Sequence, residues 1–97
     1  MDSEDAGQAL YNDMKEAAGE LLDEIEELKE EIDILESKLK FLAALMPEER
    51  LSRLYGEEIG KMESDLEYAE REFIEKTDKM NKINKLSDAI AQKSQGK

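Results

Sequence analysis

The sequence contains no cysteine, no histidine and no tryptophan among its 97 residues. Without cysteine it has neither a disulfide framework nor a thiolate nucleophile. Without histidine it also lacks imidazole acid–base catalysis, Ser–His–Asp triads and zinc sites built from histidine and cysteine. Gly7, Gly19, Gly56 and Gly60 are isolated from one another, so there is no Gly-rich phosphate-binding loop. We therefore expect no enzymatic activity, no cofactor and no metal.

Aromatic residues are scarce at 5%, and proline occurs once, whereas charged residues make up 41% of the chain. Few large side chains are available to fill a globular core, and the β-branched clusters typical of strands are missing. Glu, Lys, Leu, Ala and Ile predominate, which is the composition of long helices and coiled coils. The composition predicts an all-α protein.

Long apolar runs are also missing. The longest, from Phe41 to Met46, has six residues, far fewer than a membrane-spanning helix needs. The first five residues are acidic at three positions and lack the basic and apolar regions of a secretory signal. We expect a cytoplasmic protein that does not bind membranes.

Apolar residues recur from Leu21 onward in alternating steps of four and three, the heptad pattern of helices that pack together. Pro47 interrupts this pattern, and a second helical pattern follows it. We predict an antiparallel helical hairpin (coiled coil) within one domain, 1–97. Its expected parts are a helix at about 8–45, a bend at about 46–49 with a possible break near 56, a helix at about 50–91 and a frayed tail at 92–97. The predicted interaction seam consists of Leu21, Ile25, Leu28, Ile32, Leu35, Leu39, Ile59, Met62, Leu66 and Phe73.

Each apolar stripe contains one double step of four residues, centred on Leu21 in the first and on Phe73 in the second. Such a stutter locally unwinds a coiled coil, so two helices pack best when both unwind at the same level. Pro47 lies midway between these two residues, which predicts a fold about the proline with Leu21 beside Phe73.

The distribution of charge favours the same fold. Residues 1–36 hold 14 acidic and 2 basic residues, whereas residues 76–97 hold 2 acidic residues and 6 lysines. Antiparallel pairing brings the acidic start of the first helix against the lysines near the end of the second. These lysines are Lys76, Lys79, Lys82 and Lys85.

Several apolar residues lie beside the seam, where a lone hairpin would leave them exposed. Burying several hundred Å² of such surface would contribute several kcal/mol, at about 25 cal/mol per Å². We expect the hairpin to dimerise into a four-helix bundle or to form a hetero-oligomer with a helical, apolar protein partner. The predicted partner or dimer surface comprises Leu22, Phe41, Leu45, Leu51, Leu54 and Ile74.

The expected function is that of a protein–protein interaction module, a small acidic adaptor or chaperone that binds partner helices through its apolar seam. Two alternatives stay open. One is an acidic inhibitor that mimics nucleic acid and blocks a DNA-binding protein, and the other is a structural subunit of a larger coiled-coil complex. Direct binding of nucleic acid is not expected, because acidic residues interleave with the lysines and no aromatic residues stand among them for base stacking.

In outline, the pattern resembles two bacterial groups: small helical chaperones that hold secretion-apparatus subunits, and helical-hairpin proteins of about a hundred residues that are exported as dimers. Tyr68 and Glu72 match the Tyr-x-x-x-Asp/Glu spacing of the second group. That group has Trp-x-Gly at the bend, where this chain has Met46-Pro47-Glu48. The chain is therefore assigned to neither group.

Overall fold

The computed structural model describes the backbone of residues 3–95 and the side chains of residues 5–50 and 52–93. These residues form two long helices, α1 (Ser3–Ala43) and α2 (Arg53–Gln95), with a short 3-10 helix, η1 (Glu49–Leu51), between them. The prediction of an all-α helical hairpin is confirmed.

The helix boundaries differ from the predicted ones. Helix α1 begins earlier than residue 8 and ends two residues before 45, whereas α2 begins three residues after 50 and continues to Gln95. The backbone of 92–95, where the sequence predicts a frayed tail, is helical in this structure, and residues 96–97 lie outside the described range. Helix α2 also passes through Gly56 without a break, because a glycine costs a helix only about 1 kcal/mol and a long packed helix absorbs that cost.

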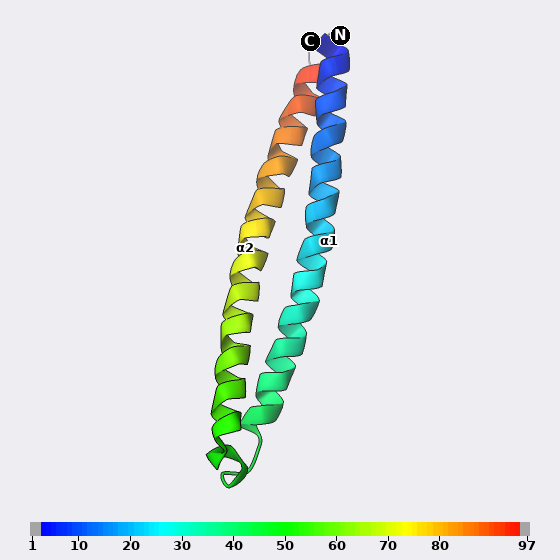
Figure 1. The fold of residues 1–97 in the computed structure, drawn as a ribbon. Coiled ribbons are helices and arrows are strands. Elements are labelled where there is room, and N and C mark those ends of the chain that lie inside the picture. Colours follow the sequence, from blue (N-terminus) through cyan, green and yellow to red (C-terminus); the bar gives the residue numbers. More distant parts are fainter. Residues whose placement is uncertain (1–2, 96–97) are drawn as a thin grey trace. The chain divides into compact units, whose positions relative to one another are not determined.

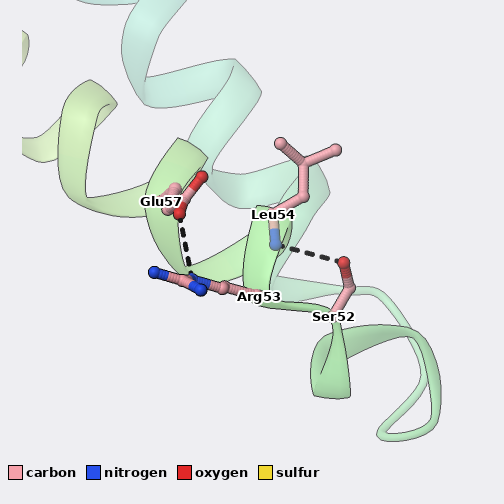
Figure 2. Close-up of polar contacts among 4 residues, drawn as sticks. All are labelled: Ser52, Arg53, Leu54 and Glu57. Carbon is pink, nitrogen blue, oxygen red and sulfur yellow. Dashed lines mark hydrogen bonds and ion pairs between the residues drawn. The ribbon is translucent and has the colours of Figure 1, made fainter.

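The bend occupies residues 44–52, so that the midpoint between the helix ends is residue 48, one residue beyond Pro47. Pro47 lies in a turn before η1 and does not begin α2. The start of α2 is set by Ser52, whose backbone is extended and whose Oγ accepts a hydrogen bond of 3.2 Å from the N–H of Leu54 (Figure 2). A serine N-cap satisfies one of the backbone donors that have no partner in the first turn of a helix.

Arg50 connects the bend to the C-terminus of α1. Its guanidinium donates hydrogen bonds to the backbone carbonyls of Ala43, at 2.5 Å, and Leu45, at 2.7 Å. These carbonyls lie at and just beyond the C-terminus of α1, where the helix dipole is negative and backbone acceptors lack partners within the helix. Arg50 therefore stabilises the end of α1.

We expect Arg50→Gln to lower the free energy of unfolding by about 1 kcal/mol, because a neutral amide cannot replace both charge-assisted hydrogen bonds. Urea denaturation followed by circular dichroism measures this change. The matched control is Arg53→Gln, which removes an exposed partner of Glu57 and should change stability little. Equal stability of the two variants would contradict the capping role of Arg50.

The chain divides into two compact units, each made from a part of α1 and a part of α2 that run in opposite directions side by side (Figure 1). The open-end unit combines the chain up to Ile25 with the chain from Ile74 onward, and the bend unit is Glu26–Phe73.

The open-end unit contains the most fully buried apolar side chains of α1. Ala18, Leu21 and Ile25 are each less than a tenth exposed. On α2 of this unit, two polar side chains occupy interior positions. Ser87 is fully buried and its Oγ donates to the carbonyl of Asn84 at 2.9 Å, whereas the buried Oγ1 of Thr77 has no hydrogen-bond partner among the described residues. A buried hydroxyl without a hydrogen-bond partner lowers the stability of the fold. The open-end unit therefore contains both well-buried apolar side chains on α1 and an unfavourable polar group, Thr77, on α2.

Among the described side chains of the open-end unit, one ion pair joins the two helices. Lys76 Nζ lies 3.1 Å from Glu24 Oε2, and both side chains are partly exposed. The predicted attraction between the acidic start of α1 and the lysines of α2 is thus seen at Lys76, whereas Lys82 pairs with Asp78 on its own helix. Exposed pairs of this kind contribute less than about 1 kcal/mol each.

The seam of the bend unit is less completely covered. Ala69 is 1% exposed, which shows that the two helices approach closely at this residue. The predicted seam residues of this unit are all half-buried, since two helices alone cannot enclose large side chains on every side. These half-buried residues are Leu28, Ile32, Leu35, Leu39, Ile59, Met62, Leu66 and Phe73.

Candidate interaction surface

The bend unit has two faces of different character, which follow from helical geometry. Residues that directly precede seam residues lie on one side of the seam and residues that directly follow them lie on the other, since each residue turns the helix by about 100°. Because α1 and α2 are antiparallel, the preceding residues of both helices share one face. We call this the groove face, and we call the other the opposite face.

Exposed apolar side chains gather on the groove face. Ile34 and Phe41 of α1 directly precede the seam residue Leu35 and the half-buried Leu42, which continues the seam by one heptad step, and Phe41 is 73% exposed. On α2, the exposed side chains of Leu54 and Tyr68 precede Tyr55 and Ala69 in the same way. The opposite face carries charged and small residues at the corresponding positions: Lys29, Asp33, Glu36, Lys40, Ala43, Gly56, Gly60, Glu63, Glu67 and Glu70. The exposed large apolar side chains of the bend unit's two helices therefore all lie on the groove face, where they stand among charged residues such as Glu58 and Lys61.

A groove of about 430 Å³ lies on this face between the two helices of the bend unit. Its walls are almost entirely apolar, since the charged lining residues contribute mainly the hydrocarbon parts of their side chains. Phe41 and Met62 stand on different helices, so both α1 and α2 are needed to form it. The groove is lined by Ser37, Lys38, Phe41, Leu42, Glu58 and Met62.

A second hollow continues the groove face along α1, away from the bend. It has a volume of about 340 Å³ and is lined by Glu27, Glu30, Glu31, Ile34, Leu35 and Lys38. Lys38 lines both hollows, so they are neighbours on the same helix surface. The groove face therefore changes from apolar near the bend to acidic further along α1.

The sequence-predicted surface residues fall into both units. Phe41 and Leu54 are exposed on the groove face of the bend unit, and Leu45 is half-buried at its end. Leu22 and Ile74 are exposed in the open-end unit. The backbone of Leu51 belongs to η1, and its side chain lies outside the described set.

Two exposed apolar residues of the groove face, Ile34 and Tyr68, are not in the predicted surface. Ile34 precedes Phe41 by one heptad, so heptad spacing relative to Phe41 could have identified it. Tyr68 directly precedes Ala69 of the second apolar stripe, so its position in that stripe could have identified it.

Comparisons with protein-family models, curated proteins and solved structures found no match. Within residues 3–95, no helix is both long enough and apolar enough to cross a membrane. The described side chains also include no cluster of three or more Asp, Glu, His or Cys residues placed to hold a metal ion.

Proposed function

We propose that this protein is a protein–protein interaction module, an adaptor or chaperone that receives an amphipathic helix of a partner protein on the groove face of the bend unit. The observation that supports this proposal most is the apolar groove beside Phe41, which both helices build and which the chain itself leaves uncovered. Large exposed apolar surfaces on small water-soluble domains are typical of interaction sites.

The shape of this surface suits a helix. Ile34 and Phe41 are seven residues apart on α1, which places them two helical turns apart on one side. A partner helix with apolar residues at the same spacing could lay one of them into the groove and another against Ile34, as in helix-in-groove recognition.

This proposal changes the role of the predicted seam. The seam residues pack α1 against α2 within the hairpin, so they build the surface and do not have to contact a partner directly. A second copy of the chain is the other occupant that the sequence suggests, and it would complete a four-helix bundle. The oligomeric state of the purified protein distinguishes a partner helix from a second copy as the occupant of the groove face.

We expect Phe41→Asp to abolish capture of a partner that the wild-type chain retains in about 0.5 M salt, because burial of apolar surface is not screened by ions. The matched control is Leu86→Asp, which makes the same kind of change at an exposed residue of the open-end unit. Affinity purification with mass spectrometry identifies the partner, and a photocrosslinker in place of Ser37 tests whether its helix lies in the groove. Equal loss with both variants, or crosslinks only outside a helix, would contradict the proposal.

A further inference from the structure

We infer that the partner helix is basic at one end, with lysine or arginine residues placed beyond its apolar anchors so that they lie over Glu27, Glu30 and Glu31. This inference rests on the proposed function and specifies the chemistry of the partner. It favours such a partner over a second copy of the chain that docks through its own bend unit.

The first support is the position of the acidic cluster relative to the groove. Glu27 precedes Ile34 by seven residues and Ile34 precedes Phe41 by seven, so the three lie along one side of α1. At 1.5 Å per residue, about 10 Å separates each from the next along the helix axis. A helix that lies along this side and fills the groove near Phe41 would reach Glu30 and Glu31 about one turn beyond Ile34, and Glu27 about two turns beyond it.

The second support is that the hollow around these carboxylates contains little positive charge to compensate them. Among the residues that line the two hollows, Lys38 is the one basic side chain, and it lines both of them. None of Glu27, Glu30 and Glu31 forms an ion pair with a described residue. Basic side chains of a partner would therefore meet carboxylates that are free to pair with them.

The third support concerns the second copy. Residues 26–73 hold 15 acidic and 7 basic residues, so each bend unit carries a net charge of −8. Two bend units that met through their groove faces would bring like charges together at the edge of the contact, which opposes association. A helix with a basic end gains from the same charges.

The inference can be tested with a synthetic helical peptide and the full chain. The probe has two leucines seven residues apart, with three lysines four to seven residues beyond the second leucine. A matched peptide has glutamate in place of the lysines, and fluorescence anisotropy measures both dissociation constants. We expect the lysine peptide to bind at least tenfold more tightly than the glutamate peptide at low salt, with the difference shrinking severalfold at about 0.5 M salt.

Two charge variants of the protein locate the interaction. The triple variant Glu27→Gln, Glu30→Gln and Glu31→Gln should weaken binding of the lysine peptide about fivefold to tenfold, in line with three partly exposed ion pairs. The control triple variant, on the opposite face of the same unit, removes the same charge and should have little effect. It consists of Glu36→Gln, Glu63→Gln and Glu70→Gln.

The results separate this inference from the proposed function. If both peptides bind equally and Phe41→Asp abolishes binding of both, helix docking stands and the basic partner is wrong. If neither peptide binds, or if the lysine peptide binds Phe41→Asp as well as wild type, docking in the groove is itself wrong. If sedimentation shows a wild-type dimer that Phe41→Asp dissociates, the second copy occupies the groove and the inference fails.

Discussion

Ile25→Asp is expected to lower the free energy of unfolding by about 3–4 kcal/mol, enough to remove most of the stability of so small a protein. Ile25 is 7% exposed and belongs to the best-packed apolar cluster of the open-end unit. The substitution loses about 2–3 kcal/mol of apolar burial and adds the cost of a carboxylate without a partner. Circular dichroism during urea denaturation should show a large shift of the transition to lower urea.

The neighbouring residue provides the control for this prediction. Leu22→Asp makes a comparable change in side-chain polarity and helix propensity, but Leu22 is 45% exposed. Its free energy of unfolding should fall by less than about 1 kcal/mol, as is usual for substitutions at exposed sites. If the two variants unfold at the same urea concentration, Ile25 is not buried between the helices of the open-end unit.

Ala69→Leu should lower the free energy of unfolding by about 1–3 kcal/mol, although it adds an apolar side chain. Ala69 is 1% exposed, the lowest value among the described apolar residues of the bend unit. A larger side chain at this close approach must push α2 away from α1, and the half-buried seam on either side would lose contact. The free energy gained by adding apolar surface at residue 69 is expected to be smaller than the free energy lost from these seam contacts.

The control for Ala69→Leu is Ala89→Leu, at an exposed alanine of the same helix. Both variants replace alanine by a residue with nearly the same helix propensity, so the difference between them reports packing. We expect Ala89→Leu to unfold at nearly the wild-type urea concentration. A more stable Ala69→Leu would show that the helices do not meet closely at residue 69.

The fold class followed from the sequence because two features act locally. Heptad spacing determines which side of each helix is apolar, and a single proline limits where the chain can reverse. The boundaries were less accurate, since they depend on individual hydrogen bonds. Ser52 caps α2 and Arg50 binds the carbonyls at the end of α1. Together these contacts determine where the two helices end, and they place the midpoint of the bend at residue 48.

The candidate surface was predicted in part. Phe41 and Leu54 stand out as apolar residues beside the seam, and the structure places both on the groove face. Leu22 and Ile74 were predicted with them, but they belong to the open-end unit. The division into units depends on contacts between distant parts of the chain, which heptad spacing does not reveal.

By itself, the sequence determined that the chain is helical, where it reverses to within a few residues, and which side of each helix is apolar. These properties depend on backbone chemistry and on residue periodicity along one helix. Only the tertiary structure decided that Phe41 and Met62 line one groove and that Ile34, Leu54 and Tyr68 stay exposed on its face. The reason is physical: a surface built from two helices depends on their rotation about their own axes, which is set by the packing between them.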